Sequence, residues 1–303
     1  MTDRASDVEA RIGTVRQLSS VIGAMRGVAA ARSREARSQL DGVRAYARTI
    51  AGSIGQILAF SPELGRADPV REELGAHAII ALVAEQGFAG AFSERVLAAV
   101  RRLADAYLVQ RTEILLIGDR GLMVAQQRGF TIDWAAPMVA HVEQAAPLAN
   151  KIVDALYARI DARRVTRVTV VHAIPDGSSA IQIVERQLLP FDFSRFPASA
   201  NKATPLLTLP PPVLLARLVE EYVFAELCEA TVLSFAAENE ARMRAMIEAR
   251  ANVTKTLDGL VARSRQLRQE EITNEIIELA GGNEANANDR DIGPGPRLKS
   301  RIT

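Results

Sequence analysis

Hydrophobic residues recur every three or four positions over two long stretches, one near each end of the chain. Residues 4–59 keep this rhythm, and the first proline, Pro62, lies just beyond them. Residues 213–281 contain no proline, and their apolar stripe is as narrow as the seam of a coiled coil. The pattern predicts two very long helices, over residues 1–60 and 213–281. The simplest way to bury both seams is to pack the helices antiparallel against each other.

Glycines interrupt the first of these helices, and each costs up to about 1 kcal/mol in a helix interior. We therefore expect this helix to need a partner surface. Gly23 and Gly27 are four residues apart, a spacing that would let another backbone approach closely, although drift in an alanine-rich helix explains it equally well. The glycines of this stretch are Gly13, Gly23, Gly27, Gly42, Gly52 and Gly55.

Between the two helices, short apolar runs alternate with helical segments. This alternation favours an α/β fold with an open, largely parallel sheet, and a strand pair joined by Pro175-Asp176-Gly177 adds an antiparallel edge. We expect a Rossmann-like central domain over residues 76–190, after a linker (61–75) and before a proline-rich connection (191–212). The expected strands are 77–84, 113–118, 130–134, 165–174 and 179–189. The expected helices are 93–108, a short helix that follows residues 119–121 and ends at Arg128, and 144–162.

After Gly281 the composition changes. Residues 282–303 offer little that can be buried, because they consist mostly of glycine, asparagine, charged residues and proline. Such a segment is predicted to be a disordered tail.

The composition excludes several classes of protein. The formal net charge is +1, so no overall field recruits nucleic acid or an anionic membrane. The first helix is basic, but it lacks the lysines and interleaved aromatic residues of a nucleic-acid-binding helix. No apolar run is long enough to span a membrane, and the acidic N-terminus is unlike a signal peptide. The single cysteine, Cys228, excludes an intrachain disulfide and fits a reducing compartment.

Groups that could carry chemistry are few and scattered. Gly87 and Gly90 follow the first expected strand and could cradle a phosphate at a helix N-terminus. They lack the third glycine of a dinucleotide fingerprint and the lysine of a P-loop, so a tight strand-to-helix turn is the favoured interpretation. The three histidines, His77, His141 and His172, lack metal-ligand spacing. We therefore expect no catalytic residue, no metal and no cofactor.

Polar motifs at both ends of the chain carry a family resemblance. Residues 11–15 (RIGTV) and 22–32 (IGAMRGVAAAR) resemble the "RI-x-S-V…IT-x-AM-x-MVAA-x-K" signature of the F-type ATP synthase gamma subunit. Residues 238–246 (ENEARMRAM) resemble that family's "SE-x-AARM-x-AM", and residues 268–279 (RQEEITNEIIEL) resemble its "RQ-x-x-IT-x-EI-x-EI" terminus. The resemblance covers roughly residues 4 to 282. The chain departs from the family at residues 84–90, where AEQGFAG replaces an "S-D-R-G-L-C-G" turn, and at Glu238, where serine is common.

The resemblance implies a non-catalytic rotor subunit. In that family the two helices form an antiparallel coiled coil inside a ring of alpha and beta subunits, and the domain at the base meets the epsilon subunit and the membrane c-ring. In that family the complex lies on the cytoplasmic face of the bacterial inner membrane, so the gamma subunit is peripheral to the membrane. Met25 and Arg26 would face an acidic lever segment of beta, and Arg242 would stabilise the same part of the shaft. Arg268, Gln269 and Thr273 would meet the catch loops of beta.

Two other functions fit parts of the pattern. A flavodoxin-like, nucleotide-dependent enzyme with helical dimerisation arms would bind nucleotide or flavin at Gly87–Gly90. A structural coiled-coil adaptor would associate with itself through its helices and would have no ATPase partner. Heptads alone would not separate the adaptor from a rotor subunit, whereas the polar motifs at both ends favour the rotor.

Overall fold

The computed structural model describes residues 2–65, 75–107, 111–162, 164–176, 181–196 and 207–288, with side chains described from residue 5 to residue 277 within these ranges. The chain divides into two compact units. One consists of residues 24–247, and the other combines residues 1–23 with residues 248–303. Helices α1 (Thr2–Phe60) and α5 (Pro211–Asn288) each contribute to both units.

Both long helices are present, and the end of the second differs from the expectation. Helix α5 continues past Gly281 and Gly282 to Asn288, so the predicted disorder is wrong for residues 282–288. Two glycines weaken a helix by about 1 kcal/mol each, but they do not forbid it, and Glu284, Ala285 and Ala287 are good helix formers. The rest of the predicted tail, from residue 289, lies outside the described residues.

The central domain is built on a five-stranded sheet with the order β3-β2-β1-β4-β5. Strands β1, β2, β3 and β4 pair in parallel, and β5 runs antiparallel to β4 at one edge, so the predicted sheet is confirmed. The strands are β1 (Ala76–Leu82), β2 (Thr112–Ile117), β3 (Trp134–Ala136), β4 (Val165–Ile174) and β5 (Gln182–Leu189).

The short third strand lies later than expected. It begins at Trp134, whereas the sequence pattern suggested residues 130–134. Gly129 adopts a left-handed φ of 72°, and the amide of Phe130 donates to the carbonyl of Ala125, so the chain is still completing the end of helix α3 there. Pairing with β2 starts only where Trp134 faces Leu115.

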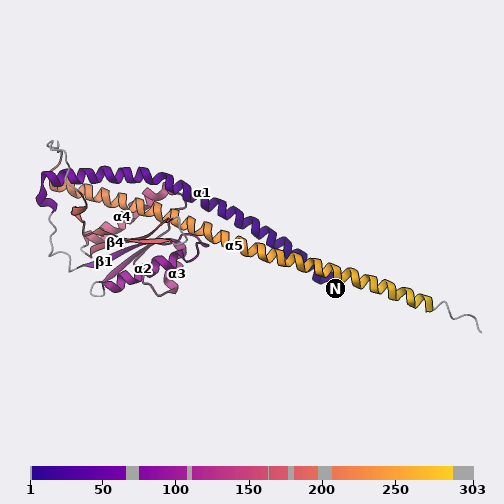
Figure 1. The fold of residues 1–303 in the computed structure, drawn as a ribbon. Helices are drawn as coiled ribbons and strands as arrows, with labels where there is room; N and C mark the ends of the chain where they lie inside the picture. The colour runs from indigo at the N-terminus through magenta and orange to yellow at the C-terminus, as the bar shows by residue number, and fades with distance from the viewer. Residues whose placement is uncertain are drawn as a thin grey trace, which may run out of the picture. The chain divides into compact units, whose positions relative to one another are not determined.

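Helices cover both faces of the sheet (Figure 1). Helices α2 (Phe92–Ala106) and α3 (Asp119–Gln127) pack on one face together with Ile79 and Ala81 of β1. Helices α4 (Ala145–Asp161), α5 and α1 lie on the other face, where Ala78, Ile80 and Leu82 point. Alternate residues of β1 thus enter opposite cores, which explains why this strand reads as a continuous apolar run.

Within the unit of residues 24–247, helix α5 lies between α1 and the sheet (Figure 1). Ala36 and Leu40 of α1 share a core with Val223 and Leu227 of α5, and that core continues into the sheet. Almost every described side chain from Tyr222 to Arg242 is buried as a result. The expectation that the two long helices bury mainly each other is therefore incomplete, because here α5 is the middle layer of three.

The two long helices are antiparallel in each unit. In the first, Arg37 pairs with Glu240 at 2.6 Å and Arg44 with Glu229 at 2.8 Å, so residue numbers rise on α1 as they fall on α5. In the second, Arg268 pairs with Glu9 at 3.1 Å. The predicted fold class, an antiparallel helix pair with a Rossmann-like open α/β domain, is confirmed.

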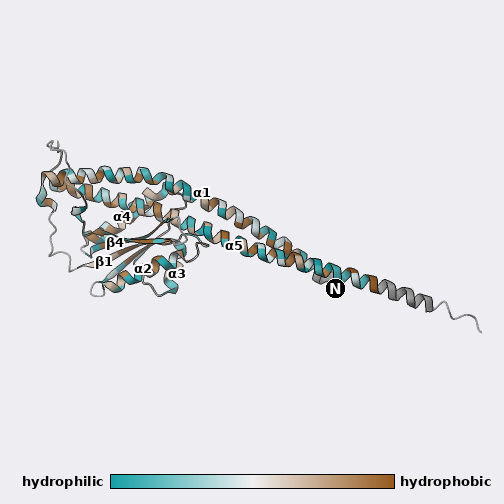
Figure 2. Ribbon diagram, in the orientation of Figure 1, coloured by the Kyte–Doolittle hydropathy of each residue, from teal (hydrophilic) through white to brown (hydrophobic). Residues whose placement is uncertain are grey.

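Apolar and polar residues are interspersed along both long helices (Figure 2). In the second unit, Ile12 and Ile22 of α1 are buried, and Val253, Leu257 and Leu267 of α5 are half-buried, as a narrow seam requires. Further along α5, Ile272 and Ile276 are exposed. Within the described part of the chain, a Cβ added to Gly23 or Gly27 would meet nothing within 4 Å, so the small-residue spacing brings no other backbone of this chain close.

No described helix is both long enough and apolar enough to cross a membrane.

Candidate functional site

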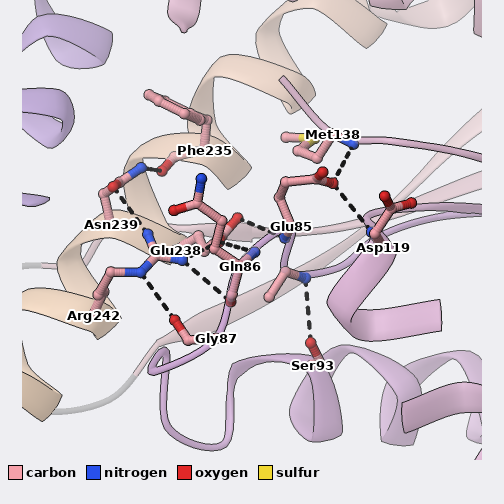
Figure 3. A network of polar contacts seen from close by, with 11 residues as sticks. Glu85, Gln86, Gly87, Ser93, Asp119, Met138, Phe235, Glu238, Asn239 and Arg242 are labelled. Atoms are coloured by element: carbon pink, nitrogen blue, oxygen red, sulfur yellow. Dashed lines mark hydrogen bonds and ion pairs between the residues drawn. The ribbon is translucent and has the colours of Figure 1, made fainter. Parts of the chain in front are cut away.

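The loop after β1 is tied to helix α5 by a buried ion pair (Figure 3). Glu238 and Arg242 lie one turn apart on α5 and form this pair, and each side chain is almost completely buried. Glu238 accepts hydrogen bonds from the backbone amides of Glu85 and Gln86, both at 3.2 Å. Its carboxylate therefore joins the helix to the loop as well as to Arg242.

Arg242 completes the connection from the same helix (Figure 3). Its Nε donates to the carbonyl of Gly87 at 3.1 Å, and its Nη2 donates to the carbonyl of Gln86 at 3.2 Å. Its Nη1 donates to Asn239 at 3.1 Å. Since the whole guanidinium is turned into the chain, Arg242 does not face outward as a partner contact would.

Glu85 anchors the same loop to the start of α3 and to the backbone at Met138 (Figure 3). Its carboxylate accepts from the amide of Asp119, the first residue of α3, at 3.1 Å, and from the amide of Met138 at 2.7 Å. A carboxylate at a helix N-terminus is stabilised by the unpaired amides and the helix dipole. The loop is thus held between α3 and α5, and Ser93 of α2 adds an Oγ that accepts from the amide of Ala84 at 3.2 Å.

This arrangement bears on the phosphate-cradle hypothesis for Gly87–Gly90. The amides of Glu85 and Gln86 are directed to Glu238, the start of α3 is filled by Glu85, and the carbonyls of Gln86 and Gly87 accept from Arg242. The chain's own carboxylates therefore bind the two amides that precede Gly87 and the amide at the start of α3. The geometry matches the alternative interpretation, a tight strand-to-helix turn, in which Gly90 has a φ of 58°.

Two of the predicted contact residues lie on α1 within the unit of residues 24–247. Met25 is half-buried and Arg26 is exposed. Neither side chain forms a hydrogen bond or ion pair with another described residue.

The other three predicted contact residues lie together on α5 in the second unit. Arg268 is exposed and pairs with Glu9, which is also exposed. Gln269 and Thr273 are exposed as well, and the Thr273 hydroxyl donates to the carbonyl of Gln269 at 2.8 Å. These side chains form one polar surface at the level where α1 begins.

The histidines and the cysteine sit in separate surroundings. His77 is buried with its Nε2 2.9 Å from the hydroxyl of Thr169, and burial lowers the pKa of His77 to about 4. His172 is buried on β4, where burial likewise lowers its pKa to about 4. Burial raises the pKa of Cys228 to about 12, which keeps its thiol protonated. Among the described residues, no three histidine, cysteine or acidic side chains are grouped as metal ligands.

Sequence reasoning singled out Arg242 but missed its partners. The signal was present in the two departures from the family pattern, at residues 84–90 and at Glu238. The structure brings these departures into contact, since Glu238 binds the amides of Glu85 and Gln86. Residues 152 or 153 positions apart in the chain share no local period that would have connected them.

Two long antiparallel helices joined to an open α/β domain define the chain as a stalk-type subunit. A family model described as ATP synthase matches residues 4–285, so the chain belongs to the ATP synthase gamma-chain family. The ATP synthase gamma chain of Flavobacterium psychrophilum is 26% identical over 283 residues, covering 92% of this chain and 97% of the relative. That of Ruegeria pomeroyi is 27% identical over 290 residues, covering 92% and 98%.

Solved structures have the same fold. A chain of the OSCP/F1/c-ring assembly of the Euglena gracilis mitochondrial ATP synthase matches with a TM-score of 0.65 and 11% identity, covering 99% of this chain and all of that one. A chain from the rotor of the same enzyme matches with a TM-score of 0.62 and 12% identity, covering 90% and 100%. At these identities the likeness concerns the fold.

Proposed function

We propose that this chain is the central-stalk rotor subunit of an F-type ATP synthase. It would couple ion flow through a membrane c-ring to conformational change at the catalytic sites of the beta subunits. The observation that carries the proposal is the antiparallel α1–α5 pair, in a chain whose gamma-chain relatives match it over 92% of its length. In this role the chain has no catalytic site and serves an enzyme complex.

The mechanism rests on unequal contacts. A rotor subunit presents a different side to each of the surrounding beta subunits, and each contact favours one conformation of the site it touches. Because the conformations differ in nucleotide affinity, turning the rotor changes that affinity at each site in sequence. A rotor must transmit torque, so its helices have to be fixed firmly to its base.

The Glu238–Arg242 pair supplies such a fixing point. It joins α5 to the loop that links β1 and α2, while the α5 core is buried between α1 and the sheet. We assign Arg242 to this internal role. The proposed contacts with beta are then Met25 and Arg26 on α1, and Arg268, Gln269 and Thr273 on α5.

The partners follow from the same role. Alpha and beta subunits would surround the helix pair, and the base would meet an epsilon subunit and the c-ring. Flavobacterium psychrophilum and Ruegeria pomeroyi, whose gamma chains resemble this one, are bacteria. The assembled complex would therefore be peripheral on the cytoplasmic face of the inner membrane, held there by its partners.

The test is co-expression with alpha and beta subunits from the same genome, followed by size-exclusion chromatography and an ATPase assay. We expect the chain to elute in one large complex and to raise sustained ATP hydrolysis above that of alpha and beta alone. Elution of the chain by itself, with hydrolysis unchanged by its presence, would contradict the proposal. A nucleotide titration of the isolated chain then tests the flavodoxin-like alternative, which requires saturable binding.

A further inference from the structure

A cavity of about 490 Å³ lies between α1, the edge strand β5 and the start of α5, within the unit of residues 24–247. The short helix η4 (Phe193–Arg195) adds a further wall. Its charged lining includes Arg44 and Arg48 from α1, Arg186 from β5, Arg195 from η4, and Glu226 and Glu229 from α5. A volume of this size is in the usual range of small-molecule sites, roughly 300–1,000 Å³.

The two glutamates of the lining are already neutralised. Glu226 is buried, and its carboxylate accepts from Arg186 at 2.5 Å and from Arg195 at 3.4 Å. Glu229 accepts from the Nε of Arg44 at 2.8 Å. These pairs hold three guanidinium groups in place around the cavity, so a ligand would lose little side-chain freedom on binding there.

Positive charge remains after this pairing. Arg48, one turn beyond Arg44 on α1, lines the cavity without an ion pair or hydrogen bond to any described residue. Arg44 uses only its Nε in its contact with Glu229, which leaves its terminal nitrogens available. Asp41 is the third carboxylate of the lining, so four guanidinium groups face three carboxylates. The surplus is carried by Arg44 and Arg48, which are both exposed and so remain accessible to an anion from solution.

We propose that this cavity binds an anion bearing a diphosphate group. Guanidinium groups match phosphate oxygens through paired N–H donors, and several converging arginines suit a ligand with several phosphate oxygens. The cavity is larger than a single phosphate requires, and Tyr222 adds an aromatic wall beside Arg195. The proposal concerns the α/β domain and the base of the helices, and it does not depend on the rotor function.

The first test measures binding of pyrophosphate to the full chain by titration calorimetry, with the ionic strength held constant by sodium chloride. We expect saturable binding that weakens about tenfold or more in Arg48→Gln, since a charge-assisted contact is lost. The matched control is Arg102→Gln, which removes an exposed arginine of α2 whose partner is Glu185. Absence of saturable heat, or equal weakening in both variants, would overturn the proposal.

A second variant, Asp41→Asn, should strengthen pyrophosphate binding where Arg48→Gln weakens it. Asp41 is exposed, and no described residue pairs with it, so Asp41→Asn leaves the fold's contacts intact while it removes a negative charge from the lining. Pyrophosphate binding should then tighten severalfold, because the repulsion between the carboxylate and the ligand is gone. Unchanged or weaker binding in Asp41→Asn would show that the anion does not sit in this cavity.

Discussion

Glu238 binds the amides of Glu85 and Gln86 while it is paired with Arg242, so one carboxylate connects α5 to loop residues 153 and 152 positions earlier in the chain. Arg242 binds the carbonyls of the same loop. Both helix residues are thus hydrogen-bonded to the backbone of the loop. A buried ion pair of this kind does not by itself stabilise a fold, but removing one partner leaves an uncompensated buried charge.

Arg242→Ala should therefore lower the free energy of unfolding by about 3–5 kcal/mol. It should also speed hydrogen exchange at the amides of Glu85 and Gln86, because Glu238 is no longer held in place. Urea unfolding and exchange mass spectrometry measure the two effects. The control is Arg217→Ala, which breaks the exposed pair with Glu220 and should cost less than about 1 kcal/mol. Equal costs for the two variants would contradict the anchoring role.

Two glycine-to-alanine substitutions should change the stability of the chain in opposite directions. In Gly42→Ala, the new Cβ on α1 meets nothing within 4 Å, so the chain gains roughly 0.5–1 kcal/mol of stability from the better helix former. In Gly121→Ala, the new Cβ on α3 would lie 2.1 Å from Cγ2 of Val83, and a helix or strand would have to shift. Overpacking of this kind costs about 1–3 kcal/mol. Thermal unfolding of both variants beside the unchanged chain measures the difference, and destabilisation by Gly42→Ala would show that α1 is packed more closely there.

Acid should destabilise the chain through its two buried histidines. The pKa of each is about 4 in the folded chain and 6.5 when unfolded, so the unfolded chain binds more protons between these values. The contribution of these histidines to the free energy of unfolding is fully present above pH 6.5. It falls as the pH is lowered towards 4, by at most about 3 kcal/mol for each histidine. Arg167 near His77 acts in the same direction as burial, while Glu226 and Glu229 partly oppose burial at His172.

The measurement is the urea midpoint between pH 4 and pH 7 for the unchanged chain, for His172→Gln and for the exposed His141→Gln. His172→Gln should flatten the profile in this window, and His141→Gln should leave its slope unchanged. A profile that His172→Gln does not alter would remove this histidine from the acid response.

Arg268 should matter for assembly more than for folding. Its pair with Glu9 is exposed on both sides, and such pairs contribute up to about 1 kcal/mol to stability. Arg268→Ala is expected to leave the unfolding midpoint nearly unchanged and to lower the yield of the complex with alpha and beta. Glu9→Gln breaks the same ion pair but keeps the cation. If both variants lowered the yield equally, the effect would come from the ion pair and not from a contact of Arg268 with a partner.

The amino-acid sequence by itself determined the elements and their order. Hydrophobic spacing and the absence of proline defined the two long helices, and apolar runs such as residues 77–84 defined the strands, because these signals come from neighbours along the chain. The polar motifs around Met25, Arg242 and Arg268 indicated the family for the same reason. The boundaries were less certain where a weak helix former is tolerated, as at Gly281, or where pairing depends on a neighbouring strand, as at Trp134.

Only the tertiary structure decided what each helix face contacts. The same three-four spacing buries Leu227 between α1 and the sheet but leaves Ile276 exposed, because burial depends on which other elements lie alongside. It also turned Arg242 inward to a loop, and it gathered Arg48, Arg186 and Arg195 from three separate segments around one cavity. Contacts between residues far apart in the chain leave no periodic trace in one sequence, so folding had to bring them together before they could be recognised.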